Sequence, residues 1–210
     1  MLLLRTVFIA AIVLLLSNSQ VNAVTVFTAN LTGSQETPPN GSTATGSATF
    51  ILNDAKTALS FTATIFGIDV NGLQTPGITA DNLTAAHIHC CQPLGSPTPA
   101  PVVWGFFGSP FNDNNPDDSP NPQHVIPFAS GVGGTFSGKW DLPEGNNTTL
   151  TAQLPGILAN LAYINFHTSA FPSGEIRGQI LLTPEPTTLC LLGIGLLALG
   201  RVLRKHRKRP

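Results

Sequence analysis

Two histidines and two cysteines lie close together in the segment LTAAHIHCC, residues 83–91. His87 and His89 are two residues apart, so in a β-strand both imidazoles project from the same face. Such a pair can chelate zinc or copper, because a neutral imidazole nitrogen is a good ligand for both metals. The same pair can instead hydrogen-bond to the backbone and have only a structural role. Both interpretations stay open, and we favour the structural one because so short a motif arises easily by chance.

A third histidine lies in the alternating segment YINFHT at 163–168, and GEIRGQILL follows at 174–182. A hairpin with its loop at 169–173 would place polar residues opposite one another on one face. The opposed pairs are then His167 with Glu175, Asn165 with Arg177, and Tyr163 with Gln179. If the strand of His87 lies beside this hairpin, three histidines converge, with Glu175 as a fourth ligand or as a hydrogen-bond partner of a ligand. The candidate zinc or copper ligands are His87, His89, His167 and Glu175.

The chain has three cysteines, of which Cys190 lies near the C-terminus. The adjacent pair, Cys90 and Cys91, belongs to the body of the protein. Free thiols tend to oxidise outside the cytoplasm, so a disulfide between these two neighbours is our first expectation. A bridge to another chain and metal binding are the alternatives.

The other residues complete no known catalytic arrangement. Ser169 lies two residues after His167, but the chain contains no Gly-x-Ser-x-Gly nucleophile motif. A dinuclear copper–zinc centre uses more histidines than the four between residues 24 and 183. We therefore expect a protein that is not an enzyme and has no required cofactor.

The first 23 residues have the three parts of a secretory signal peptide. Arg5 gives a positive start, VFIAAIVLLL at 7–16 is a short apolar stretch, and VNA at 21–23 predicts cleavage after Ala23. An N-terminal membrane anchor is the alternative.

The C-terminal segment, residues 184–210, begins with Pro184, Glu185 and Pro186, continues with an apolar run at 188–200 and ends in a basic cluster. The basic residues should stay in the cytoplasm while the run lies in the membrane as a short helix. This order closely resembles the PEP-CTERM sorting signal of Gram-negative bacteria. The resemblance implies processing near the Pro-Glu-Pro motif by an exosortase, with release to the cell surface or matrix of bacteria that make exopolysaccharide. An ordinary C-terminal anchor is the alternative, and it too leaves the body outside the cytoplasm.

The body between these two ends, residues 24–183, has the length of one domain. It contains ten acidic and three basic residues, a net charge of −7 with histidine neutral. Nucleic-acid binding needs a basic face, so this class of partner is excluded.

Short runs rich in β-branched and aromatic residues recur in the body between turn signals, and no long run has a helical period. We therefore expect an all-β fold, a single antiparallel sandwich, with short helices at the N-terminal signal and the C-terminal anchor. The segment LNDAK at 52–56 is expected to be a hairpin turn. The predicted strands are 24–32, 44–52, 57–66, 83–89, 101–107, 132–138, 148–154, 161–168 and 174–182.

Three segments together resemble the CHRD domain: LTGSQETPPNGSTATGSATFIL at 31–52, LTAAHIHC at 83–90 and AYINFHTSAFPSGEIRGQI at 162–180. They extend over nearly all of the body. The cysteines at 90 and 91 depart from the family, in which small residues are commoner at these positions. The resemblance implies a sandwich of immunoglobulin-like or Cu,Zn superoxide dismutase-like shape and implies no catalytic activity.

Together these features predict an exported, non-catalytic cell-surface or matrix protein that associates with exopolysaccharide or envelope proteins. An extracytoplasmic zinc- or copper-binding protein is the alternative.

Overall fold

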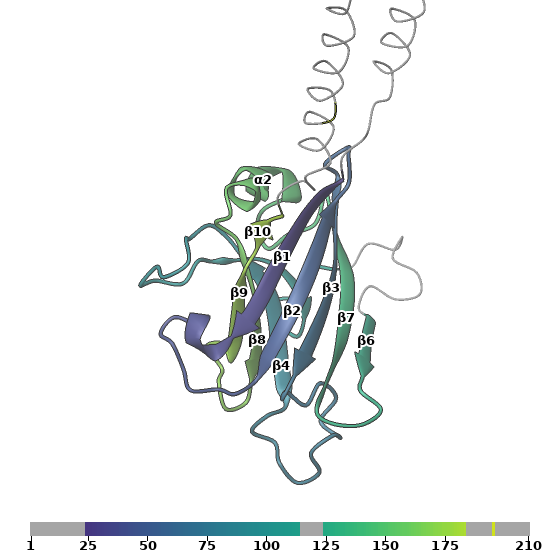
Figure 1. The fold of residues 1–210 in the computed structure, drawn as a ribbon, viewed down its shortest axis with the longest axis vertical. Helices are drawn as coiled ribbons and strands as arrows, with labels where there is room; N and C mark the ends of the chain where they lie inside the picture. Colours follow the sequence, from purple (N-terminus) through teal and green to yellow (C-terminus); the bar gives the residue numbers. More distant parts are fainter. Residues whose placement is uncertain (1–23, 114–123, 184–194, 196–210) are drawn as a thin grey trace, which may run out of the picture.

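The computed structural model describes residues 24–113, 124–183 and 195 (Figure 1). The predicted signal peptide, the Pro184-Glu185-Pro186 motif and both predicted terminal helices lie outside the described residues. No helix within the described ranges is long and apolar enough to cross a membrane.

The regular secondary structure of the described body is mostly antiparallel strand, so the all-β prediction is confirmed. One α-helix and a short 3-10 helix, η1, interrupt them. The elements are β1 (Thr25–Thr32), η1 (Gly33–Gln35), β2 (Thr45–Leu52), β3 (Ala58–Phe66), β4 (Leu83–His89), β5 (Val102–Phe107), β6 (His124–Pro127), β7 (Gly133–Asp141), α2 (Leu150–Leu158), β8 (Tyr163–Thr168), β9 (Ile176–Gln179) and β10 (Leu181–Leu182).

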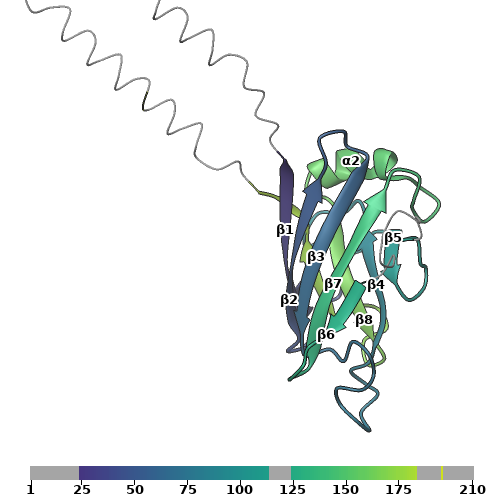
Figure 2. The same ribbon diagram turned by 90° about the vertical axis from the view of Figure 1, so that its right-hand side faces the viewer.

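The strands form one continuous sheet that curls over itself. Its order is β5-β4-β8-β9-β1-β2-β3-β7-β6, and β10 pairs with β1. Strands β9 and β1 meet at the pair Arg177 and Thr32. On either side of this junction the two halves of the sheet form separate layers, with β1, β2, β3 and β7 in one and β4 and β8 in the other (Figure 2). The predicted sandwich is therefore a single folded sheet.

Aromatic side chains fill the space between the two layers. Phe61 of β3 packs against Trp104 of β5 with ring centroids 5.9 Å apart, and Phe136 of β7 packs against Phe166 of β8 at 5.1 Å. Trp104 stacks on Trp140 at 5.8 Å, and both rings are fully buried. Strand alternation directs these apolar residues inward and the intervening polar residues outward.

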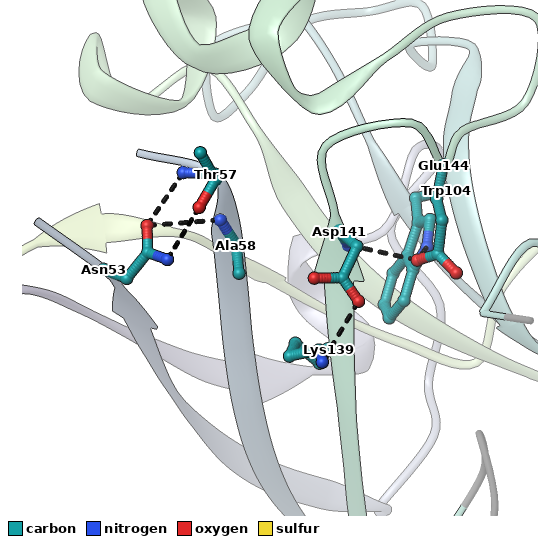
Figure 3. A network of polar contacts seen from close by, with 7 residues as sticks. All are labelled: Asn53, Thr57, Ala58, Trp104, Lys139, Asp141 and Glu144. Atoms are coloured by element: carbon teal, nitrogen blue, oxygen red, sulfur yellow. Dashed lines mark hydrogen bonds and ion pairs between the residues drawn. The ribbon is translucent and has the colours of Figure 1, made fainter. Parts of the chain in front are cut away.

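Two turns hold the ends of these strands through side-chain hydrogen bonds (Figure 3). The predicted turn at 52–56 is present, and the Asn53 side-chain oxygen accepts from the backbone N–H groups of Thr57 and Ala58 at 2.8 and 3.2 Å. Its left-handed residue is Lys56, with φ of 56°, and not the asparagine or aspartate. In the turn after β7, the Trp104 indole N–H donates to a Glu144 carboxylate oxygen at 3.2 Å.

The strand predicted at 148–154 is wrong, because this segment forms helix α2. Thr149 caps the helix, since its hydroxyl accepts from the Ala152 backbone N–H at 3.3 Å. Leu150, Leu154 and Ile157 then recur at helical spacing and are the buried residues of the helix. The range 148–154 contains only Leu150 and Leu154 of this set, and a spacing of four residues places two side chains on one face of a strand as well as of a helix.

Candidate functional site

Strand β4 lies between β5 and β8. The strand of His87 and His89 therefore lies beside the β8–β9 hairpin of His167, as convergence of the three histidines requires. His87 pairs with Asn165 of β8, and His89 pairs with Tyr163. The β8–β9 hairpin also has the expected register, with Asn165 opposite Arg177 and Tyr163 opposite Gln179. The polar side chains of β4, β8 and β9 therefore share one face, turned away from the aromatic core.

His87, His89 and His167 form a compact cluster on this face, which we call the histidine cluster. One ring nitrogen from each residue lies within 4.8 Å of the others. The Nδ1 atom of His87 and the Nε2 atom of His167 are 3.2 Å apart. The three side chains are only 5, 7 and 9% exposed, respectively. A cluster of three imidazoles in this geometry can hold one metal ion.

The outer nitrogen of each imidazole faces a backbone carbonyl. His87 Nε2 lies 3.0 Å from the Ser109 oxygen, and His89 Nδ1 lies 2.8 Å from the Ala100 oxygen. His167 Nδ1 lies 3.0 Å from the Pro172 oxygen. A carbonyl oxygen can only accept, so each outer nitrogen carries the hydrogen of a neutral imidazole.

Burial keeps all three imidazoles neutral. It lowers the pKa of His87 and of His89 to about 4, and it lowers the pKa of His167 below its ordinary value. The inner nitrogens, His87 Nδ1, His89 Nε2 and His167 Nε2, therefore have lone pairs. Within the described residues His89 Nε2 makes no well-formed hydrogen bond, although the side chain of Asn165 lies close enough to oppose, in part, the lowering of the His89 pKa by burial.

Glu175, the fourth predicted ligand, lies outside the histidine cluster. Its carboxylate accepts hydrogen bonds from the hydroxyls of Ser42 at 2.6 Å and Thr168 at 2.5 Å. These contacts tie the loop before β2 to the β8–β9 hairpin. The sequence placed Glu175 on the correct face, but it contained no signal that two hydroxyls would occupy the carboxylate.

Two family models match the chain. The CHRD domain model matches residues 27–180. The chain belongs to the CHRD domain family. A second model, the PEP-CTERM protein-sorting motif, matches residues 182–208. A search of curated proteins and of solved structures finds no match.

The sorting motif establishes the destination of this CHRD protein. The motif is the signal that an exosortase recognises, so the protein is exported and processed. It then resides in the cell envelope or outside the cell. The described sheet ends with β10 at Leu182, which is the first residue that the sorting-motif model matches.

The polar face of the CHRD domain continues from the histidine cluster toward β9. The Tyr163 ring stacks on His89 with centroids 4.6 Å apart, and the Arg177 guanidinium lies 3.5 Å from the centre of the Tyr163 ring. Arg177 is 1% exposed and donates to the Thr37 hydroxyl at 3.1 Å and to the Gln179 side-chain oxygen at 3.3 Å.

Glu36 is a buried acid near this arginine that the sequence analysis did not identify. Burial raises its pKa to about 7, although the charge of Arg177 acts in the opposite direction. Glu36 also lines two surface hollows of about 510 and 230 Å³. The one available signal was its place in QETPP, within the first segment that resembles the family.

Cys90 and Cys91 form a disulfide at the end of β4. Cys90 is buried in the apolar core, on the side of the sheet opposite His89. Both sulfurs pack against Gly156 of α2, where an added Cβ atom would collide with them. The disulfide thus packs the end of β4, the strand that carries His87 and His89, against α2.

Proposed function

We propose that the exported CHRD domain is a non-catalytic binding module that associates with neutral exopolysaccharide through an exposed sheet face. This face consists of two rows of side chains across β1, β2, β3 and β7, which we call the hydroxyl face. The first row is Thr28, Thr49, Thr62 and Ser137, and the second is Asn30, Ser47, Thr64 and Thr135.

The eight residues of the hydroxyl face are uncharged, and the Lys139–Asp141 ion pair adjoins them on β7. Thr28, Thr49 and Thr62 are exposed and directly paired across three neighbouring strands. Neighbouring strands lie about 4.8 Å apart, so the hydroxyls form a regular array. This array is the observation on which the proposal rests.

A neutral polysaccharide matches such an array, because each sugar hydroxyl can donate and accept a hydrogen bond. Single exposed hydrogen bonds contribute little, but a polymer can make many at once. The acidic body repels anionic polymers, which favours a neutral chain. Stacking of a sugar on tryptophan is excluded, because Trp104 and Trp140 are both fully buried.

The hydroxyl face is suited to binding and not to catalysis. Neither row contains a histidine or a carboxylate that could activate a hydroxyl. This supports the proposal that the domain acts by association.

Co-sedimentation of the full chain with exopolysaccharide purified from the producing bacterium tests this function. Combining Thr28→Val, Thr49→Val and Thr62→Val removes three hydroxyls at nearly constant shape and should reduce the bound fraction about tenfold. The matched control combines Thr43→Val, Thr98→Val and Thr151→Val, which alter exposed threonines outside the two rows. Equal binding by both variants would contradict the proposal.

Deletion of residues 184–210 tests the role of the sorting segment. Strand β10 pairs with β1 through Leu182 and Phe27, so the deletion leaves the described sheet complete. The truncated protein should be exported but absent from the surface fraction. Unchanged surface location would show that the segment is dispensable.

A second function, extracytoplasmic binding of zinc or copper, is favoured by the unpartnered nitrogen of His89. It uses residues outside the hydroxyl face and does not depend on polysaccharide binding.

A further inference from the structure

The arrangement of hydrogens in the histidine cluster leaves three lone pairs facing one another. Each outer nitrogen must donate to its carbonyl, and a neutral imidazole carries one N–H. The inner nitrogens of all three rings are therefore bare acceptors. Two of them, His87 Nδ1 and His167 Nε2, are separated by only 3.2 Å.

Two lone pairs at this distance repel each other unless a proton or another cation lies between them. With the outer nitrogens donating to their carbonyls, a proton shared by His87 and His167 would make one ring an imidazolium and would serve only two of the three inner nitrogens. A proton between His87 and His167 would also leave the buried His89 Nε2 without a partner. One metal ion satisfies all three nitrogens at once.

We propose that His87 Nδ1, His89 Nε2 and His167 Nε2 bind a single zinc or copper ion. Nitrogens that share a tetrahedral ion at bond lengths of 2.0–2.1 Å are about 3.3 Å apart. The separation between His87 and His167 already matches this value. One nitrogen of each ring lies within 4.8 Å of the others, so the rings must close by about 1.5 Å at most to complete the site.

The ligand set selects the class of metal. Three neutral imidazoles suit zinc and copper, whereas calcium and magnesium require oxygen ligands. Glu175 is occupied by Ser42 and Thr168, and the sulfurs of Cys90 and Cys91 are joined to each other. Copper should bind more tightly than zinc, because an imidazole site follows the general order of divalent metal affinities.

The surroundings hold the three rings in the orientation that binding needs. The carbonyls of Ala100, Ser109 and Pro172 come from three separate loops, and each fixes one ring. Hydrogen bonds of this kind orient metal-binding histidines and select their tautomer. A purely structural role explains these outer contacts, but it gives no reason for the inner nitrogens to converge.

Metal titration of the full chain, purified in detergent and stripped with a chelator, tests the proposal. Calorimetry with zinc sulfate or copper sulfate should give one ion per chain, and the bound ion should raise Tm. His89→Gln and His167→Gln should each weaken binding at least about 100-fold. The matched control is His124→Gln in β6, a strand that pairs with β7 and not with β4 or β8.

Spectroscopy separates loss of a ligand from loss of the fold. The electron paramagnetic resonance spectrum of the unmodified chain with one equivalent of copper(II) should show coupling to three imidazole nitrogens. Fewer than 0.1 ions of zinc or copper per folded chain, on the order of background, would overturn the proposal. A spectrum without nitrogen coupling, or unchanged affinity in both glutamine variants, would also overturn it.

Discussion

The two layers of the curled sheet both direct polar side chains away from the core, but only one of them leaves these side chains in water. On β1, β2 and β3 the outward Thr28, Thr49 and Thr62 are exposed. On β4, β8 and β9 the outward residues are covered by loops, and Arg177 is 1% exposed. The strand pattern is the same in both layers, and the covering loops create the difference. A polar group on an open face is satisfied by water, whereas a polar group on a covered face needs a protein or ligand partner.

This contrast explains why the unpartnered atoms are informative on the covered face. Burial of an unsatisfied polar atom costs about 1–3 kcal/mol, so few are retained without a reason. His89 Nε2 and Asn165 Oδ1 are both buried on this face without a well-formed hydrogen bond among the described residues, and their two side chains are neighbours. On the hydroxyl face no such conclusion is possible, because water can hydrogen-bond to every exposed donor and acceptor.

Replacement of Arg177 by leucine should have the largest effect on stability. The change removes the hydrogen bonds to Thr37 and Gln179 and the contact with the Tyr163 ring, and it leaves Glu36 without its nearby positive charge. We expect a loss of about 3–5 kcal/mol in the free energy of unfolding, measured by urea denaturation. A loss below about 1 kcal/mol would show that the covered face tolerates charge removal as an open face does.

Glu36 should make stability decrease as the pH rises. Its pKa is about 7 in the folded protein and lies above the ordinary value of 4.5, so the folded state binds the proton more tightly than the unfolded state does. The contribution is therefore complete below pH 4.5 and is lost as the pH rises through 7.

The measurement is the difference in free energy of unfolding between Glu36→Gln and the unmodified chain. Glutamine stays neutral, so this difference should shift in favour of the variant by about 3 kcal/mol between pH 4.5 and pH 8. Subtraction removes the contribution of the histidines, which is common to both proteins. A difference that is independent of pH would mean that Glu36 is solvated like an open-face residue.

A matched pair of threonines compares the two faces directly. Thr168 is fully buried and donates to Glu175, whereas Thr49 is exposed in the hydroxyl face. Thr168→Val should cost about 1–3 kcal/mol, because the Glu175 carboxylate loses a donor. Thr49→Val should change stability by less than about 0.5 kcal/mol. Equal effects in urea denaturation would remove the distinction between the faces.

The sequence predicted well which side chains of β4, β8 and β9 form the polar face. Strand alternation and the length of the 169–173 loop determine which side chains share a face. It placed His87, His89 and His167 together for this reason. It could not predict the carbonyls of Ala100, Ser109 and Pro172, since backbone groups of loops have no signature in residue type. The same limitation applies to Glu175, whose partner Ser42 lies 133 positions away.

Helix α2 and the single curled sheet show a second limit of prediction from the sequence. The segment that starts at Leu150 contains β-branched and apolar residues typical of a strand, and only the cap at Thr149 and the buried Ile157 show the helix. The continuity of the sheet depends on the pairing of Thr32 with Arg177, two residues from opposite ends of the body. Local patterns do not contain such long-range pairings.

Among the charge removals, the smaller effect is expected from Lys139, the counterpart of Arg177 in the layer of the hydroxyl face. Its amine lies 3.2 Å from an Asp141 carboxylate oxygen, and its side chain is 28% exposed (Figure 3). Water screens this ion pair, so Lys139→Met should cost no more than about 1 kcal/mol in urea denaturation, even though it also removes a cation from a strand. The Arg177→Leu and Lys139→Met variants thus carry the same loss of charge in the two layers. If Lys139→Met were as destabilising as Arg177→Leu, the covering loops would not be the cause of the difference, and loss of positive charge from an acidic body would explain both results.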